Sequence, residues 1–416
     1  MHYGGLIMNM RQDSRRIIEA AIHAAQPDTA VKKALANLPS YTGRLVLISI
    51  GKAAWQMAYA AHLELGSRIS SGLVITKYGH AKGAIGSFSI HEAGHPVPDA
   101  NSYAATQEAI RLVSGLSAED LVLFLISGGG SALFESPLVS PEELEDVTGQ
   151  MLACGASITE INTIRKHLSA VKGGKFAQLC APTQIYSVIL SDILGDPLDM
   201  IASGPAYPDS TAVEETLSIA AKYHLRLSET AQAYLRIDTP KSLSNVQSII
   251  TGSVRQLCDA AKKEAEAMGY TPIILTDCLC CEAREAGSFI GSMAHYYRKL
   301  DGRYAIIAGG ETVVHLTGHG KGGRNQEMAL AAAAQMAGLK DVLMFSVGSD
   351  GTDGPTDAAG GIVTGETYAV LLEKGISIDA VLRENDAYTA LGQADGLIFT
   401  GPTGTNVNDL SCLLIG

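Results

Sequence analysis

Short apolar runs recur along this chain, and nearly all of them end in glycine or a small polar residue. The clearest runs have five or six residues, are rich in Val, Ile and Leu, and lie at 45–50, 121–126, 185–190, 304–308 and 342–347. Continuous apolar runs of this length predict strands covered on both faces, as in parallel sheets. Most are followed by an amphipathic helical stretch, so the pattern predicts an α/β doubly wound architecture.

Glycines cluster at the ends of these predicted strands. The chain has 44 glycines in 416 residues, which is about half again the usual share. In open α/β sheets, ligands bind outside the carboxyl ends of the strands. We therefore expect the active site to be built from glycine-rich loops at these strand ends.

The length predicts two domains, because single cores rarely grow beyond about 250–300 residues. The stretch at 236–248, RIDTPKSLSNVQS, is polar and follows neither the helical nor the strand period. We place the boundary within it, which gives a first domain of residues 1–240 and a second of residues 241–416. The two halves share no repeat of fixed period.

Composition narrows the class of partner. Apolar residues make up 46% and charged residues 18%, so a sizeable core can form and wholesale disorder is not expected. The net charge of −12 argues against nucleic acid as a partner, because such proteins usually display a basic face. It does not exclude an anionic small molecule, since a local group of Lys and Arg can bind phosphate.

Cysteine usage and hydropathy predict a soluble cytoplasmic protein with no membrane partner. The seven cysteines form no disulfide framework, and an odd number without a secretory signal predicts reduced thiols. The N-terminus lacks an apolar segment long enough for a signal peptide. No window approaches 18 uninterrupted apolar residues, the length that a membrane span needs. A homodimer is compatible with these features.

Two familiar catalytic motifs are excluded. HEAGH at 91–95 matches the H-E-x-x-H pattern of zinc proteases, which requires both His on one helix. Gly94 and the prolines at 96 and 98 crowd the second His, so we reject that helix and the protease with it. No G-x-x-x-x-G-K-[ST] occurs, which excludes a Walker A kinase.

The segment GHGKGG at 318–323 fits G-x-G-x-x-G and precedes a predicted helix at 325–337. As a nicotinamide fingerprint it is incomplete, because Asp350 lies beyond the usual spacing of about 20 residues. Lys321 and Arg324 suit a more highly charged phosphate group. Glycines kept only for tight turning are the alternative, but we predict an anion site that binds phosphates.

Two further strand ends also suit anions. Lys52 follows the run at 45–50 and opens a predicted helix, where the helix N-terminus already favours negative charge. SGGGS at 127–131 resembles a nest of successive backbone N–H groups, which could hold a carboxylate or a phosphate. A surface lysine beside a glycine turn is the structural alternative for Lys52.

Acidic residues follow two other predicted strands. Asp192 and Asp196 lie in SDILGD, and Asp350, Asp353 and Asp357 lie in SDGTDGPTD. Each alone is commonly a turn-capping residue. Together, beside cationic loops, they are typical of sites that hold Mg²⁺ or accept a hydroxyl proton in phosphoryl transfer.

Taken together, these loops resemble one known family. In order they are GKAA at 51, HEAGHPVPD at 91, SGGGSAL at 127, SDILGDPLDMIASGP at 191, GGET at 309, GKGGRNQE at 320, GSDGTDGPTDAAG at 348 and GTNVND at 404. Their order and wording closely resemble the type-II glycerate 2-kinase family over roughly residues 11–416. Eight distinctive loops in one order are far more specific than any single one.

The resemblance implies a fold and an activity. It implies an N-terminal Rossmann-like doubly wound parallel sheet and a C-terminal α/β domain of the MOFRL type, with the active site in the cleft between them. The implied reaction transfers the γ-phosphoryl group of ATP to the 2-hydroxyl of D-glycerate, with Mg²⁺ as cofactor. Members were formerly described as hydroxypyruvate reductases, so an NAD(P)H-dependent reductase is the rival. A ligand-sensing module without turnover is a second rival.

The resemblance also implies roles for individual residues. Lys52 and Arg324 match the essential lysine and arginine of the family, and Asp192 is the third expected catalytic residue. Asp192, Asp196 and Asp350 are the expected metal ligands. The residues expected at the substrate and the phosphates are Ser127, Gly128, Gly129, Gly130, Ser131, Glu311, Lys321, Gly322, Gly323 and Asn325.

Overall fold

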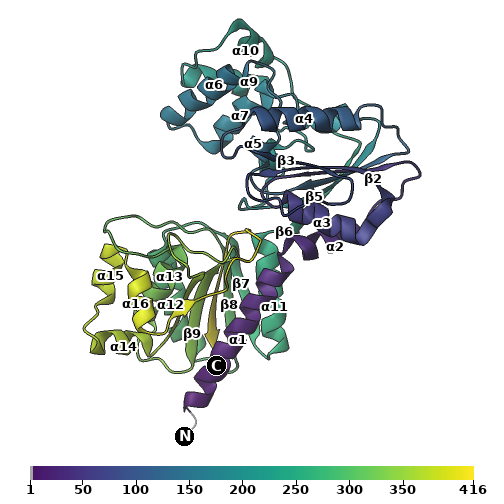
Figure 1. The fold of residues 1–416 in the computed structure, drawn as a ribbon. Coiled ribbons are helices and arrows are strands. Elements are labelled where there is room, and N and C mark those ends of the chain that lie inside the picture. Colours follow the sequence, from purple (N-terminus) through teal and green to yellow (C-terminus); the bar gives the residue numbers. More distant parts are fainter. Residues whose placement is uncertain (1–2) are drawn as a thin grey trace. The chain divides into compact units, whose positions relative to one another are not determined.

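The structure is a computed structural model, and it describes residues 3–416, with side chains from residue 9 onward. The chain divides into two compact units (Figure 1). The first, Ala30–Thr251, is called the parallel-sheet unit here. The second, called the mixed-sheet unit, joins the N-terminal residues up to Thr29 to Gly252–Gly416.

The parallel-sheet unit contains a six-stranded sheet in the order β3-β2-β1-β4-β5-β6. Its strands are β1 (Leu45–Ile50), β2 (Ile69–Lys77), β3 (Ser89–Ala93), β4 (Leu121–Ile126), β5 (Gln184–Leu190) and β6 (Val246–Gly252). The pairings from β3 through β5 are parallel, and β1 lies in register with β4 from Leu45–Leu121 to Ile50–Ile126. The strand order reverses between β1 and β4, which makes this the topological switch point where ligands bind in such sheets.

Alternate positions of the central strands face two different helical layers, as the pleat requires. Leu45 and Leu47 pack with α2 (Pro27–Leu35) and α3 (Ala54–Leu65) on one face. Ile48 and Ile50 pack with α4 (Ala100–Val113) and α8 (Lys175–Cys180) on the other. Because both faces are covered, these strands are continuously apolar, and the predicted doubly wound fold is confirmed for this unit.

Helices inserted after β4 and β5 form a small separate core in the same unit (Figure 1). They are α6 (Pro141–Ala153), α7 (Ile158–Leu168), α9 (Val213–Lys222) and α10 (Glu229–Tyr234). Helix α7 begins with a capping box between Ser157 and Glu160. Shorter elements of the unit are η1 (Gly66–Arg68), α5 (Gly130–Leu133) and η2 (Ile201–Ser203).

The mixed-sheet unit contains a second six-stranded sheet, in the order β11-β10-β9-β12-β8-β7. Its strands are β7 (Thr271–Leu279), β8 (Tyr304–Gly310), β9 (Val342–Gly348), β10 (Gly360–Thr364), β11 (Leu397–Ile398) and β12 (Asp409–Ile415). The C-terminal strand β12 lies between β8 and β9 and is antiparallel to both. The runs at 304–308 and 342–347 are therefore buried strands, but they are not parallel neighbours, since a third strand separates them.

Helices cover both faces of the second sheet, so this unit is also α/β, as predicted. The helices α1 (Tyr3–Ala24) and α11 (Val254–Ala267) pack on one face, and α12 (Ala283–Tyr297) and α13 (Arg324–Gln335) on the other. The remaining helices are α14 (Thr367–Glu373), α15 (Ile378–Glu384) and α16 (Ala387–Gln393). No helix within residues 3–416 is both long enough and apolar enough to span a bilayer.

The two units divide the chain differently from the predicted domains 1–240 and 241–416. Helix α1 packs against α11, and Arg16 of α1 pairs with Glu264 at 2.6 Å. The first 29 residues therefore belong with the C-terminal half of the chain. Strand β6 completes the first sheet and extends that unit past residue 240. The polar stretch at 236–248 thus lies just before the change of unit at Thr251, and the N-terminal residues join the second unit through packing with a segment remote in sequence.

Candidate functional site

The loops that follow β1 and β4 are joined to each other at the switch point. The Lys52 amide donates to the Gly128 carbonyl at 2.8 Å. The Ser127 hydroxyl donates to the Ile50 carbonyl at 3.2 Å and accepts from the Ala53 amide at 3.1 Å. Gly51 has φ +113°, and a β-carbon there would overlap Ser127. Only glycine allows the two loops to approach this closely.

Lys52 and Asp192 lie together beside the glycine run. The Asp192 carboxylate rests against Gly128 so closely that a β-carbon on this glycine would overlap it. Burial raises the pKa of Asp192, and the nearby charge of Lys52 opposes that rise. The aliphatic part of Lys52 lies against Gly129. The structure thus brings these predicted residues from three separate loops into one place.

The glycine run has free backbone donors. Within the described chain, the amides of Gly128, Gly129 and Gly130 have no protein hydrogen-bond acceptor. Gly129 adopts a left-handed φ of +86° and precedes the short helix α5. Successive unpaired N–H groups around a left-handed residue form an anion-binding concavity. The geometry therefore agrees with a nest at 127–131.

His95 also belongs to this cluster, and our sequence analysis missed it. Its ring lies against Gly129, and burial lowers the pKa of His95, helped by the charges of Lys52 and Lys77. No role was predicted for His95, although HEAGHPVPD is one of the eight loops, and the predicted absence of a helix at HEAGH is confirmed, because His91 lies in strand β3. The signal that could have identified His95 is its position in the loop directly after β3, a strand of the same sheet.

Asp196 is the predicted residue whose surroundings fit a cation best. It adopts a left-handed φ of +52°, and among the described residues its buried Oδ1 has no hydrogen-bond partner. Mg²⁺ is usually held by one or two carboxylates together with substrate phosphates and water. Within residues 9–416, no group of three His, Cys, Asp or Glu side chains is arranged around a metal. Asp192 and Asp196 therefore fit Mg²⁺ only as a site completed by a phosphate ligand.

In the mixed-sheet unit, Arg324 is held by two carboxylates. Its Nε and one terminal nitrogen donate to Asp409 at 2.6 and 3.0 Å, and the other terminal nitrogen lies 3.2 Å from Glu311. Burial alone would lower the pKa of Arg324, but the hydrogen bonds and charge of Asp409 raise it. Asp409 was not predicted; it begins β12, a strand whose partner the sequence did not reveal.

The N-terminus of α13 already has an anionic partner. Asp353 accepts the amides of Asn325 and Gln326 at 3.1 and 2.9 Å, and burial raises the pKa of Asp353 to about 6. Asn325 is itself buried, and its side-chain oxygen accepts from Ser346 at 2.6 Å. The expected phosphate contact from this helix end and from Asn325 is therefore not supported, since an internal carboxylate occupies these donors.

The glycines at 318–323 serve close packing. A β-carbon on Gly318, Gly320 or Gly323 would overlap Glu384, Asp386 or Asp353 respectively. Gly322 also packs against this segment, beside Asn385 and Ala387. Lys321 lies over the Tyr388 ring, 4.3 Å from its centre. Close packing is sufficient to explain these glycines, so their surroundings lend no support to a phosphate loop, which stays a prediction.

The remaining aspartates of the mixed-sheet unit have local partners. Asp350 accepts the amide and the hydroxyl of Thr352 at 2.9 and 3.1 Å, as in an Asx turn. Asp357 accepts the Tyr388 hydroxyl at 2.7 Å. Neither geometry suggests a metal ligand, so the predicted role of Asp350 has no support in its surroundings.

Comparison with known proteins places the chain among kinases. Residues 13–236 match a family described as a domain of unknown function, DUF4147, and residues 304–409 match the MOFRL family. A D-glycerate 2-kinase of Thermotoga maritima is 51% identical over 96% of this chain and 97% of its own length. A glycerate 2-kinase of Pyrococcus horikoshii is 40% identical over 99% and 98%.

The fold agrees with the same relatives. The crystal structure of a glycerate kinase from Thermotoga maritima superposes with a TM-score of 0.94 at 49% identity, covering 98% of this chain and 100% of that one. A Pyrococcus horikoshii crystal structure superposes with a TM-score of 0.92 at 39% identity. The resemblance that the eight loops indicated is confirmed, and with it the two-unit α/β fold.

Proposed function

Because this chain belongs to the type-II glycerate kinase family, we propose that it transfers the γ-phosphoryl group of ATP to the 2-hydroxyl of D-glycerate, giving 2-phosphoglycerate and ADP. The observation that carries the proposal is the cluster at the switch point of the parallel sheet. There a lysine, a partly buried carboxylate and three backbone amides that have no protein acceptor among the described residues meet at the ends of β1, β4 and β5. Phosphoryl transfer depends mainly on positioning and charge neutralisation, which these groups can supply.

Lys52 neutralises the moving phosphoryl group. Within residues 9–416 it forms no ion pair, although its charge reaches Asp192. An ammonium group without a carboxylate partner retains its full charge for an anionic ligand. The nest at 127–131 places neutral donors on the same ligand or on the glycerate carboxylate.

Asp192 accepts the proton of the glycerate 2-hydroxyl, or orients that hydroxyl. A carboxylate whose pKa is raised by burial is a better proton acceptor than a solvated one. His95, with its lowered pKa, is neutral near pH 7 and adds a hydrogen-bonding group beside the same glycine.

Mg²⁺ would be held by Asp192 and Asp196 together with the phosphates of ATP. Its contribution when bound is to neutralise phosphate charge and align the transferred group. The unpaired Oδ1 of Asp196 is the observation that favours this pair over Asp350.

We assign Arg324 to the same reaction, as a cation of fixed orientation that binds the transferred phosphoryl group. Asp409 holds its guanidinium in a two-point contact, which fixes its direction. The side chain of Glu311 is about half exposed and pairs with Arg324. We therefore propose that Glu311 orients Arg324 and does not bind phosphate itself. Lys321 remains a candidate for a peripheral phosphate contact.

The test is incubation of the purified protein with ATP, Mg²⁺ and D-glycerate. Enolase added without phosphoglycerate mutase forms phosphoenolpyruvate only from the 2-phosphate. We expect phosphoenolpyruvate under these conditions. Product that appears only when the mutase is also present would mean 3-phosphorylation and would refute the positional claim.

The same preparation distinguishes the reductase. A nicotinamide enzyme would consume NADH with hydroxypyruvate and would not need ATP. The G-x-G-x-x-G at 318–323 lends this rival little support, because the helix after it is already capped by Asp353. NADH consumption without ATP-dependent phosphorylation would replace our proposal with the reductase. Binding without either turnover would favour the sensing module.

A further inference from the structure

The loop after β5 carries both candidate metal ligands and holds an unfavourable backbone conformation. We call residues 191–204 the aspartate loop. Asp196, Ala202 and Ser203 have left-handed φ values of 52°, 52° and 60°. Residues with a β-carbon rarely adopt this conformation, and it persists only where the surroundings enforce it.

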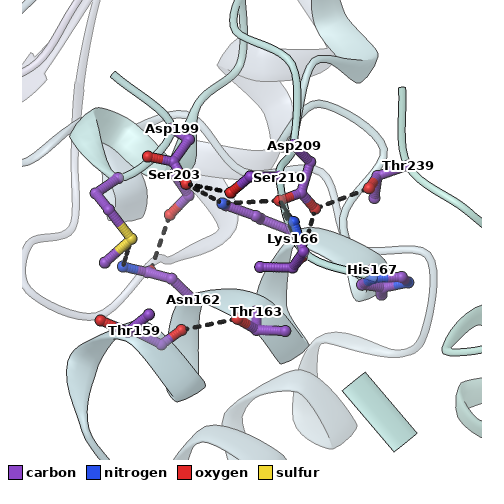
Figure 2. Close-up of polar contacts among 12 residues, drawn as sticks. Thr159, Asn162, Thr163, Lys166, His167, Asp199, Ser203, Asp209, Ser210 and Thr239 are labelled. Carbon is purple, nitrogen blue, oxygen red and sulfur yellow. Dashed lines mark hydrogen bonds and ion pairs between the residues drawn. The ribbon is translucent and has the colours of Figure 1, made fainter. Parts of the chain in front are cut away.

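One side chain of helix α7 provides part of that enforcement. The Lys166 ammonium donates to Asp199 of the aspartate loop at 3.2 Å and to Asp209 at 3.1 Å (Figure 2). Lys166 is 1% exposed and Asp209 is fully buried. Burial alone would raise the pKa of Asp209, but Lys166 and the hydrogen bonds from Thr211 and Thr239 lower it. Lys166 therefore links the aspartate loop, through Asp199, to the buried carboxylate of Asp209.

A second connection joins the same helix to the nest. The Ser203 hydroxyl donates to the side-chain oxygen of Asn162 at 3.1 Å, one helical turn before Lys166 (Figure 2). The Ser203 and Ser131 hydroxyls lie 2.9 Å apart, and Ser131 is the last residue of the nest. Ala202 packs directly on Gly130. The far end of the aspartate loop is thus bound to α7 and to the nest at once.

These contacts serve geometry more than bulk stability. A buried ion pair is weak support for a fold, because desolvation offsets much of the attraction. Two of the connections, through Asp199 and Ser203, end on the loop that presents Asp192 and Asp196.

We propose that Lys166 and Asn162 are positioning residues, which act through Asp199 and Ser203 to hold Asp192 against the nest and Lys52. The inference rests on the proposed function. It predicts that loosening the loop lowers kcat more than it raises KM, because misplaced groups fail chiefly in the transition state.

Asp199→Asn is the most selective variant. It removes one charge of the network but leaves the Lys166–Asp209 pair intact, so the buried lysine keeps a counterion. We expect kcat to fall about 10- to 100-fold while KM for D-glycerate changes less than about 3-fold. Ser203→Ala, which breaks the link to Asn162 and Ser131, should give the same type of change, with a smaller fall in kcat.

Glu160→Gln is the matched control. Glu160 lies on the same helix and pairs with Lys222 at 2.7 Å, but neither residue contacts the aspartate loop. Glutamine preserves the capping box. This variant should retain the kcat of the wild type. The control shows whether the loss of any ion pair of α7 lowers kcat, or only the loss of the pair that holds the aspartate loop.

Hydrogen–deuterium exchange provides a readout that does not require activity. In Asp199→Asn, amides of residues 191–204 should exchange at least about 10-fold faster, while those of β1, β4 and β5 stay at wild-type rates. In Glu160→Gln, the loop should exchange as in the wild type.

The outcomes separate the two claims. An inactive wild type refutes the proposed function, and exchange still tests the loop. An active wild type with unchanged kcat and unchanged exchange in Asp199→Asn overturns the positioning role. Faster exchange across the whole unit, with kcat recovered at lower temperature, would show a general structural role and would also overturn it.

Discussion

The two units hold their candidate cations in opposite ways. In the parallel-sheet unit, Lys52 has no ion-pair partner within residues 9–416 and lies beside a nest of unpaired amides. In the mixed-sheet unit, Arg324 is held by Asp409 and Glu311, and the neighbouring helix end is capped by Asp353. The donors around Lys52 are therefore available to a ligand, whereas those of Arg324 and of the start of α13 are largely bound by carboxylates of the protein.

This difference teaches that a cation in a glycine-rich loop is not by itself an anion site. Lys52 is available because the β1 and β4 loops use their own backbone to hold each other. Arg324 is instead preorganised, since a two-point contact with a buried carboxylate fixes the direction of its remaining donor. An unpaired cation can interact fully with an anionic ligand, whereas a cation held by a carboxylate presents its remaining donor in a fixed direction. The experiments below test that contrast.

Lys52→Met should have the largest effect. We expect kcat/KM for D-glycerate to fall by roughly 10³-fold or more, because a transition-state charge contact is lost. The free energy of unfolding should change by less than about 1 kcal/mol, since no ion pair is broken. Steady-state kinetics and urea unfolding measure both. Lys32→Met, at an exposed pair with Glu64, is the control, and near wild-type turnover in Lys52→Met would remove the lysine from the mechanism.

Arg324→Lys should have the next largest effect, and it should differ in kind. Lysine keeps the charge but cannot make the two-point contact with Asp409. We expect kcat/KM to fall about 10²-fold and the unfolding free energy to fall by about 2–3 kcal/mol, because Asp409 loses its partner. Arg303→Lys, at the more exposed pair with Asp13, controls for the exchange itself. An unchanged stability would mean that the clamp is not important for the fold.

Asp353→Asn tests the capped helix end through pH. The usual aspartate pKa of 3.8 rises to about 6 here, so the folded state holds this proton more tightly than the unfolded chain. Stability from protonated Asp353 is present below pH 4 and is lost as pH rises through 6. The slope approaches about 1.4 kcal/mol per pH unit at its steepest, or about 2–3 kcal/mol over the window.

Chemical denaturation between pH 4 and pH 7 measures this contribution. The difference in unfolding free energy between the wild type and Asp353→Asn should decrease across that range. Asp357→Asn, at a surface carboxylate of the same loop, should show no such decrease. A difference that stays constant with pH would mean that Asp353 is ionised throughout.

Glu311→Gln should have the smallest effect. Its side chain is about half exposed, and such pairs contribute only about 0–1 kcal/mol. Releasing one nitrogen of Arg324 should lower KM for the anionic substrates by about 2- to 5-fold and leave the melting temperature unchanged. Titration calorimetry with ATP checks the affinity. A large loss of activity would instead make Glu311 a direct participant.

The local sequence was sufficient for much of the parallel-sheet unit. The apolar runs of six residues at 45–50, 121–126 and 185–190 became β1, β4 and β5, because both faces of these strands are buried. Lys52, the nest and Asp192 follow those strands, and parallel strands place their carboxyl ends at one edge of the sheet. The order of the strands then decides which of those ends are neighbours.

Other features depended on residues far apart in the chain. The glycines at 318–323 looked like a phosphate loop, but their neighbours Asp353 and Glu384–Ala387 make them packing positions. A glycine allows close approach of any group, so the motif alone cannot say whether a ligand or the protein itself comes near. His95 and Asp409 were missed for the same reason, since each acquires its role from a distant loop or strand.

The sequence by itself determined where the strands end and which reactive groups follow them, because burial and chain geometry act locally. The tertiary structure decided which of those groups are free. Among the described residues Lys52 has no ion-pair partner, whereas Arg324 and the start of α13 received carboxylates from β12 and from the loop after β9. Charges act over several ångströms between segments that are remote in sequence, so their pairing is settled only when the chain has folded.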